Sequence, residues 1–223
     1  MSIPKVIHYC WFGRGEKSEL MNRCIDSWRK YCPDWKIIEW NEDNFDPCFC
    51  PYAEKAYKKK RYGFLADAAR LQIIYEHGGV YLDTDVELIR PIGNLCDNEA
   101  WFAYGTTTDI NTGSGFGAEK GNWMLKYLLD NYKSFNKNQN FELCTTIDTR
   151  MFKLHFFDFA SNHDVTQKYD GVLIINDIWR YVIHHYTNTW MTKSQKFSGR
   201  ILKILPENFS NSFKKIRKSI LKR

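Results

Sequence analysis

Apolar and polar positions divide the chain into short segments of two alternating kinds. Segments with the pattern of β-strands occur at residues 5–12, 35–40, 80–82, 86–89, 101–104 and 172–175. Segments with apolar residues three or four positions apart, which is typical of helices, occur at 18–32, 52–60, 62–77, 122–132 and 146–158. Residues 113–117 hold three glycines and are expected to form a loop. Strands that alternate with helices predict an α/β domain with a mainly parallel central sheet.

The pattern changes near residue 196. Phe209, Phe213, Ile216 and Ile220 recur at helical spacing, and basic residues occupy most positions between them. This pattern predicts a catalytic domain over residues 1–195 and a basic amphipathic helical tail over 196–223. Such a helix suits an anionic membrane surface. The alternative is that its apolar stripe packs on the body of the protein.

The basic charge is concentrated in this tail. The chain has 32 basic and 26 acidic residues, and six of the basic ones lie within residues 213–223, which hold no acidic residue. The remaining chain is formally neutral and lacks the spread basic face of a nucleic-acid-binding protein, so we expect no nucleic-acid partner.

Cysteine spacing and the N-terminus point to a reducing compartment. Seven cysteines occur at irregular intervals without a Cys-x-x-Cys pair, so neither a zinc site nor a disulfide framework is expected. The first residues form no apolar leader, and no run of about 18 apolar residues could span a membrane. We therefore expect a cytoplasmic protein, peripheral on the inner face of the cytoplasmic membrane through its tail.

Candidate chemistry begins where the predicted strand 80–82 leads into two carboxylates. Asp83 and Asp85 are separated by Thr84, and Gly78 and Gly79 end the preceding helix. Paired carboxylates at a strand end can hold Mg²⁺ or Mn²⁺, and such a metal stabilises a phosphate leaving group. The alternative is a pair of solvated turn residues.

The helix before this strand carries a second charged pair. Asp67 and Arg70 are three residues apart and share one helix face, with only alanines between them. Arginine can bind phosphate bidentately or donate to sugar hydroxyls. The alternative is an ordinary salt bridge within the helix.

Residues 62–71 and 74–85 together closely resemble the D-x-D signature of the family 32 glycosyltransferases. This family includes initiating α-mannosyltransferases of the yeast Golgi and many bacterial capsule and lipopolysaccharide enzymes, and its signature is similar to that of glucosylating toxin domains. Residues 3–13, 24–28 and 33–35 resemble the family's N-terminal pattern. Residues 111–115 and 184–190 resemble its later segments less closely. In the second of these, Thr189 stands where serine is usual, which keeps a hydroxyl group.

The resemblance implies a GT-A-type fold that binds a nucleotide-sugar, and it implies roles for individual residues. Asp85 would bind Mn²⁺ or Mg²⁺, and Asp83 would contact the metal or the ribose. Asp67 and Arg70 would hold the transferred sugar and orient the diphosphate. The further residues implied in binding the donor or the metal are Trp11 (stacked on the base), Asn111 and Gly113 (facing the sugar), and His184 (on the metal or the diphosphate). The alternative for His184 is an ordinary pair with His185 at a strand end.

The implied function is metal-dependent transfer of a hexose, with retention, onto a glycan or lipid-linked acceptor in surface polysaccharide synthesis. Bacterial resemblance favours a UDP-sugar. Front-face substitution is expected because no carboxylate nucleophile is singled out, although Asp109 and Asp148 stay open for that role.

Two other functions compete with this one. A haloacid-dehalogenase-like phosphatase also has D-x-D, but it needs threonine or valine where Glu87 stands and a motif near the N-terminus. A noncatalytic glycan- or nucleotide-binding protein on the same fold is the second alternative.

Overall fold

The computed structural model describes residues 3–105, 109–156, 159 and 165–187. The chain divides into two units, Met1–Tyr186 and Thr187–Arg223, and only Thr187 of the second unit is described. The predicted boundary between residues 195 and 196, and the predicted helical tail 196–223, therefore lie outside the described residues. Among the residues described, no helix is long and apolar enough to cross a membrane.

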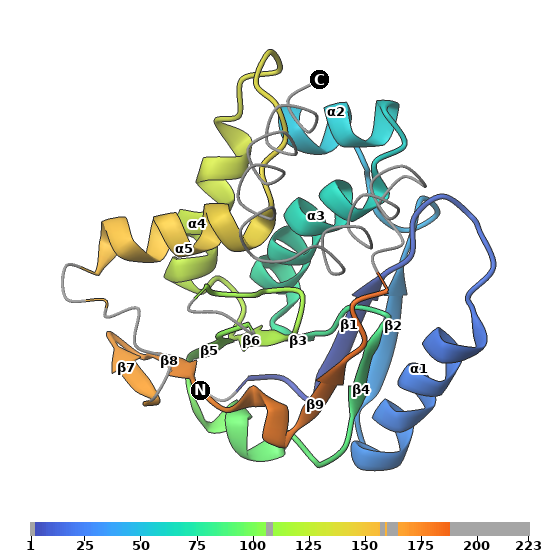
Figure 1. Cartoon of the computed structure of the whole chain (residues 1–223), viewed down its shortest axis with the longest axis vertical. Helices are drawn as coiled ribbons and strands as arrows, with labels where there is room; N and C mark the ends of the chain where they lie inside the picture. The colour runs from blue at the N-terminus through green and yellow to red at the C-terminus, as the bar shows by residue number, and fades with distance from the viewer. Residues whose placement is uncertain (1–2, 106–108, 157–158, 160–164, 188–223) are drawn as a thin grey trace, which may run out of the picture. The chain divides into compact units, whose positions relative to one another are not determined.

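A mixed β-sheet forms the centre of the first unit (Figure 1). Within the described residues it has seven strands in the order β2-β1-β3-β6-β5-β8-β7. Their bounds are β1 Val6–Cys10, β2 Lys36–Trp40, β3 Gly79–Tyr81, β5 Ala100–Ala103, β6 Phe116–Ala118, β7 Gln167–Tyr169 and β8 Val172–Ile175. Five of these seven strands share one direction, whereas β6 and β7 are reversed, so the predicted mainly parallel α/β architecture is confirmed.

Helices cover both faces of this sheet. Their bounds are α1 Glu19–Tyr31, α2 Pro51–Lys58, α3 Tyr62–His77, α4 Trp123–Lys133 and α5 Cys144–His155, with 3₁₀ turns η1 Gly93–Asp97 and η2 Ile178–Arg180. Alternate strand residues point to the two faces. Tyr81 and Phe102 join one core with α2–α5, and their neighbours Val80 and Trp101 join the other with α1 and η1. Figure 1 shows α2–α5 grouped on one side and α1 on the other.

Predicted helix starts agree with the structure. The Ser18 side chain accepts a hydrogen bond from the backbone N–H of Met21, and the Asn122 side chain accepts one from Met124. Each side chain thus satisfies an N–H that the first helical turn leaves without a partner.

The expectation of a loop through residue 117 was wrong. Gly117 lies in β6 and pairs with both Val80 and Trp101. A Cβ atom there would stand 2.5 Å from Nε1 of Trp101, so the crossing indole requires glycine. Because a strand with two small residues has little β-propensity, its sequence looked like part of the loop.

Strands β4 Val86–Leu88 and β9 Val182–His184 pair antiparallel and form a separate two-stranded ribbon. Helix α1 satisfies polar groups of β4 with its side chains. Nε1 of Trp28 donates to the carbonyl of Val86 at 2.8 Å, and the N–H of Leu88 donates to Oγ of Ser27 at 2.8 Å. Strand β4 is therefore held between β9 and α1.

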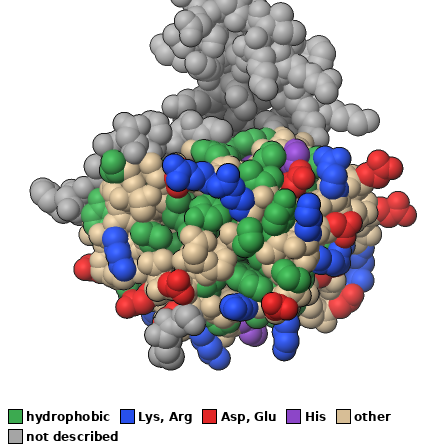
Figure 2. Space-filling view, turned by 90° about the horizontal axis from the view of Figure 1, so that it is seen from below, with side chains coloured by type: hydrophobic (Ala, Val, Ile, Leu, Met, Phe, Trp, Pro, Cys, Tyr) green, Lys and Arg blue, Asp and Glu red, His purple; other side chains and the backbone are tan. Residues whose placement is uncertain are grey.

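The surface mixes apolar and charged side chains. Figure 2 shows apolar side chains gathered toward the middle of the face seen from below, with acidic and basic side chains more frequent toward its rim. Exposed apolar atoms of this kind are ordinary for a folded domain.

Replacing His8 should change how stability depends on pH. His8 is 1% exposed, and Nε1 of Trp40 donates to its Nδ1 at 3.0 Å. Burial, helped by the nearby His77, lowers the pKa of His8 from 6.5 to about 4. As the pH falls, His8 therefore binds a proton in the unfolded chain before it does so in the folded protein. The free energy of unfolding is highest above pH 6.5 and decreases, by on the order of 3 kcal/mol, as the pH falls toward 4.

Urea unfolding at pH 7 and pH 4.5 measures this effect. The variant His8→Gln should lose less free energy of unfolding between the two pH values than the wild type does. An equal loss in both proteins would show that His8 is not the group responsible.

Candidate active site

The two carboxylates of the D-x-D motif lie just beyond the carboxyl end of β3. The N–H of Leu82 donates to the carbonyl of His8 in β1, and the N–H of Val86 donates to the carbonyl of Asp83, which closes a turn. Because β1 and β3 are parallel neighbours, their carboxyl ends meet at one edge of the sheet. Asp83 and Asp85 are therefore presented at the edge where α/β proteins place their ligands.

The structure brings His184 to these carboxylates. Asp83, Asp85 and His184 each offer one ligand atom, and the three atoms lie within 4.8 Å of one another. Nε2 of His184 is 3.3 Å from Oδ1 of Asp85, and its Nδ1 is 3.0 Å from Oγ of Ser114. The hydroxyl of Ser114 thus orients the ring, as outer partners of metal-binding histidines do.

This donor set fits a divalent cation. Two carboxylates suit Mg²⁺ and Mn²⁺ alike, and an imidazole favours Mn²⁺, because Mg²⁺ prefers oxygen ligands. The predicted contribution of His184 to a metal group is therefore geometrically possible, and the structure supplies Ser114 as a partner that the sequence did not single out.

Arg70 lies behind these carboxylates, within α3. Its side chain is 2% exposed, forms an ion pair with Asp67, and places Nη1 3.6 Å from Oδ2 of Asp83. The guanidinium carbon lies 5.5 Å from the ring centroid of Tyr81. Nε and Nη1 of Arg70 have no hydrogen-bond partner among the residues that the structure describes. The predicted salt bridge within the helix exists, and the same arginine also reaches the D-x-D motif.

Burial and neighbouring charges shift the pKa values of Arg70 and Asp83 in opposite directions. Burial alone would lower the pKa of Arg70, but Asp83 and neighbouring groups hold it above its ordinary value. Burial raises the pKa of Asp83, whereas Arg70 opposes that rise. The hydroxyl of Tyr81 donates to Oδ1 of Asp83 at 3.0 Å, which fixes the carboxylate toward the arginine.

A glycine lets the backbone of loop 111–115 approach this cluster. A Cβ atom on Gly113 would lie 2.6 Å from Oδ2 of Asp83 and 3.1 Å from Nη1 of Arg70. The N–H of Gly113 donates to Oδ1 of Asn111 at 3.0 Å, so the amide of Asn111 shapes the loop itself. Both predicted residues therefore lie at the site.

Asp148 in α5 holds the same loop through a hydrogen bond. Oγ1 of Thr112 donates to Oδ2 of Asp148 at 2.8 Å, and the carboxyl group is 0% exposed. Burial raises the pKa of Asp148 to about 6. A fully enclosed carboxyl group is better suited to holding the loop than to attacking a sugar, which was the role left open for Asp148.

Trp11 follows β1 at the same edge of the sheet, but its contacts are local. Its Nε1 donates to the carbonyl of Gly15 at 2.6 Å, and Nζ of Lys17 lies 5.3 Å from its ring centroid. Its role with a nucleotide base stays a prediction.

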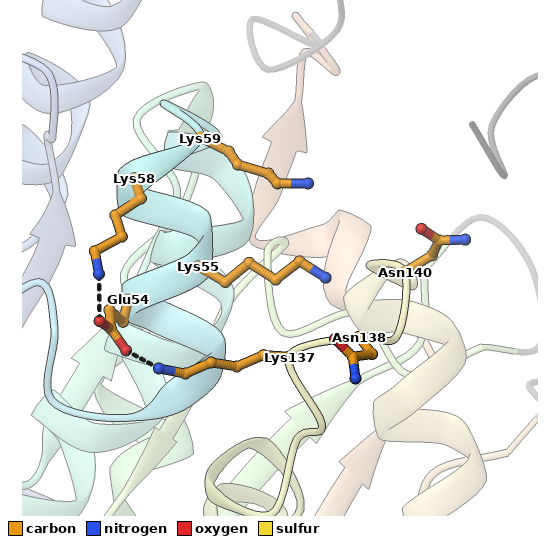
Figure 3. A pocket seen from close by; sticks show the side chains of 7 residues that line it. All are labelled: Glu54, Lys55, Lys58, Lys59, Lys137, Asn138 and Asn140. Atoms are coloured by element: carbon orange, nitrogen blue, oxygen red, sulfur yellow. Dashed lines mark hydrogen bonds and ion pairs between the residues drawn. The ribbon is translucent and has the colours of Figure 1, made fainter.

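A cationic hollow of about 450 Å³ opens between α2 and the loop after α4 (Figure 3). Its lining residues are Glu54, Lys55, Lys58, Lys59, Lys137, Asn138 and Asn140. Lys58 and Lys137 both pair with Glu54. None of the predicted site residues lines this hollow. The rings of Phe64 in α3 and Phe141 in the loop stack at 4.7 Å, so the loop packs on the helix that carries Asp67.

Comparison with known proteins shows which family these residues resemble. Residues 18–102 match the family described as glycosyltransferase sugar-binding region containing DXD motif. This segment of the chain is thus similar to the DXD glycosyltransferase family. The segment contains both carboxylates of the motif, as well as Asp67 and Arg70, and the match sets aside the phosphatase alternative.

Two curated relatives of this chain come from Schizosaccharomyces pombe. Inositol phosphoceramide mannosyltransferase 3 is 27% identical over 154 residues, which cover 66% of this chain and 42% of the relative. Inositol phosphoceramide mannosyltransferase 1 is 29% identical over 149 residues, which cover 60% of this chain and 44% of the relative. The aligned part is thus less than half of each relative's length.

One solved structure resembles the fold of this chain. The PaToxG glycosyltransferase superposes with a TM-score of 0.55 at 18% identity, covering 69% of this chain and 70% of that one. At this level of identity the likeness concerns the α/β fold, which fits the predicted GT-A type.

Substituting Gly113 should weaken the binding of Mn²⁺. In Gly113→Ala the new methyl group would force the Asp83 carboxylate to move, and we expect the affinity for Mn²⁺ to fall roughly 10- to 100-fold. Gly93→Ala is the matched control, because a Cβ atom there meets nothing within 4 Å. Calorimetric titration with Mn²⁺ measures both, and equal affinity in the two variants would refute the close approach at Gly113.

Proposed function

We propose that this protein transfers a hexose from a nucleotide-sugar donor to a glycan or lipid-linked acceptor. The observation that carries the proposal is the convergence of three separate segments on one edge of the sheet. Helix α3 supplies Asp67 and Arg70, the end of β3 supplies the D-x-D carboxylates, and β9 supplies His184. The match of residues 18–102 to the DXD family and the names of the relatives support the same reaction.

Asp83, Asp85 and His184 would hold the divalent cation, with Mn²⁺ favoured. When bound, such a cation neutralises the diphosphate and makes it a better leaving group. Ser114 would keep the imidazole of His184 turned toward Asp85. Tyr81 would keep the Asp83 carboxylate in place through its hydroxyl.

Asp67 and Asp83, the two carboxylates that pair with Arg70, are exposed enough to reach a sugar. Their side chains are 12% and 31% exposed, whereas that of Arg70 is 2% exposed. We therefore assign contacts with sugar hydroxyls to these two carboxylates. Arg70 would hold both carboxylates in position and add positive charge beneath the diphosphate.

Front-face substitution remains our proposal for the chemical step. The acceptor oxygen bonds to the anomeric carbon on the face that the diphosphate leaves, and the acceptor proton passes to a departing phosphate oxygen. The enclosure of Asp148 supports this scheme, because it removes one candidate for a carboxylate nucleophile on the opposite face. The anomeric configuration of the product, observed by NMR, would distinguish retention from inversion.

The identities of the acceptor and the donor, and the cellular location, are also part of this proposal. The names of the relatives, which specify inositol phosphoceramide, support a lipid-linked acceptor, and a basic tail on an anionic membrane would bring the enzyme to it. A UDP-sugar and a role in surface polysaccharide synthesis rest on the sequence resemblance. Because both relatives are named as mannosyltransferases, GDP-mannose is the competing donor.

Nucleotide release tests the proposal directly. We expect the wild type with Mn²⁺ to hydrolyse one donor slowly from a panel of UDP-, GDP- and CMP-sugars. Asp85→Asn should reduce the rate by roughly 100-fold, because the cation would lose a ligand. Asp130→Asn removes an exposed carboxylate that pairs with Lys126 and should keep the full rate.

One outcome would contradict the proposed transferase activity. If no nucleotide is released and calorimetry detects no nucleotide binding, the protein is a noncatalytic member of the family.

A further inference from the structure

A second group of metal-binding side chains lies beside the candidate active site. Cys24 in α1, Glu87 in β4 and His185 directly after β9 each offer one ligand atom, and these atoms lie within 4.8 Å of one another. Cys24 is buried, whereas the side chains of Glu87 and His185 are 25% and 23% exposed. The group is therefore enclosed on its cysteine side and accessible from its polar side.

This group shares no ligand with the D-x-D group, although the two meet along the same ribbon. His184 directs its Nε2 to Asp85 at 3.3 Å, and the next residue, His185, directs its Nε2 to Glu87 at 2.8 Å. Consecutive residues of an extended chain point to opposite sides. The N–H of His185 donates to the carbonyl of Asp85 at 3.0 Å, so the backbone between the two groups is fixed.

The donor atoms of the two groups differ in chemical character. The D-x-D group has two carboxylates and one imidazole, which suit a hard or borderline cation. The second group has a thiol, an imidazole and one carboxylate, and thiolate ligands select softer ions, of which zinc is the commonest with imidazole beside it. Three protein ligands leave one position for water in a tetrahedral shell.

We propose that Cys24, Glu87 and His185 bind a zinc ion. On binding, the thiol of Cys24 releases its proton to solvent and the thiolate bonds to the metal. The hydrogen bond between His185 and Glu87 opens, and each side chain turns its ligand atom to the ion. The sequence argued against a zinc site because no Cys-x-x-Cys pair exists, but these ligands come from three distant segments.

The ion would fasten α1 to both strands of the ribbon. Helix α1 already contacts β4 through Trp28 and Ser27, whereas the end of β9 is held by its pairing with β4. A metal bond to His185 would add a link from α1 to the end of β9. Since His184 is the adjacent residue, the same link would limit its movement in the active site.

Cobalt provides a probe with a specific signal. Co²⁺ bound to a thiolate gives a sulfur-to-cobalt charge-transfer band in the near ultraviolet, whereas Co²⁺ on oxygen and nitrogen ligands alone does not. We expect the full-length, metal-free protein to show this band after addition of Co²⁺, and added Zn²⁺ to remove it. Asp85→Asn should keep the band, because that residue belongs to the other group.

Cysteine variants identify the ligand. Cys24→Ser should lose the charge-transfer band and bind one Zn²⁺ fewer than the wild type, as measured by elemental analysis after gel filtration. Cys96→Ser, which replaces another buried cysteine, should behave as the wild type. Absence of the band in the wild type, or its persistence in Cys24→Ser, would overturn the proposal.

A second variant covers the case in which Cys24→Ser does not fold. His185→Gln changes a partly exposed side chain, and circular dichroism would establish that it is folded. We expect its Zn²⁺ affinity at this site to fall at least roughly tenfold. An unchanged affinity would overturn the assignment of His185.

Discussion

The ion pairs of Arg70 are the interaction on which the candidate site depends. An almost fully enclosed guanidinium contacts Asp67 within its own helix and lies 3.6 Å from Asp83 at the end of β3. A buried cation is costly unless it is paired, and removing one partner of such a pair typically costs about 3–5 kcal/mol. The charge of Arg70 therefore ties α3 to the strand end that presents the metal ligands, and it sets where Asp83 can point.

The remaining parts of the site surround this pair. Gly113 brings a loop backbone against Asp83 because it has no side chain, and the buried carboxyl group of Asp148 holds that loop through Thr112. The β4–β9 ribbon delivers His184 from a distant part of the sequence. These contacts are non-local, so the geometry of the site exists only once the sheet and the ribbon have formed.

Local patterns in the sequence predicted α3, the strand before Asp83 and the Asp67–Arg70 pair. Each of them depends on spacing within a few residues, which the sequence displays directly. Strand β6 was missed because Gly117 replaces a strand-forming residue where the Trp101 indole crosses. The group formed by Cys24, Glu87 and His185 had no sequence signal, since its members come from three segments that only the folded ribbon and α1 bring together.

Anomalous diffraction from crystals grown with Mn²⁺ and a nucleoside diphosphate would test the central claim most directly. If the site is assembled as described, the manganese peak lies between the carboxylates of Asp83 and Asp85 and Nε2 of His184, with the diphosphate against it. A nucleotide and manganese bound elsewhere, with these three side chains free of both, would contradict the account.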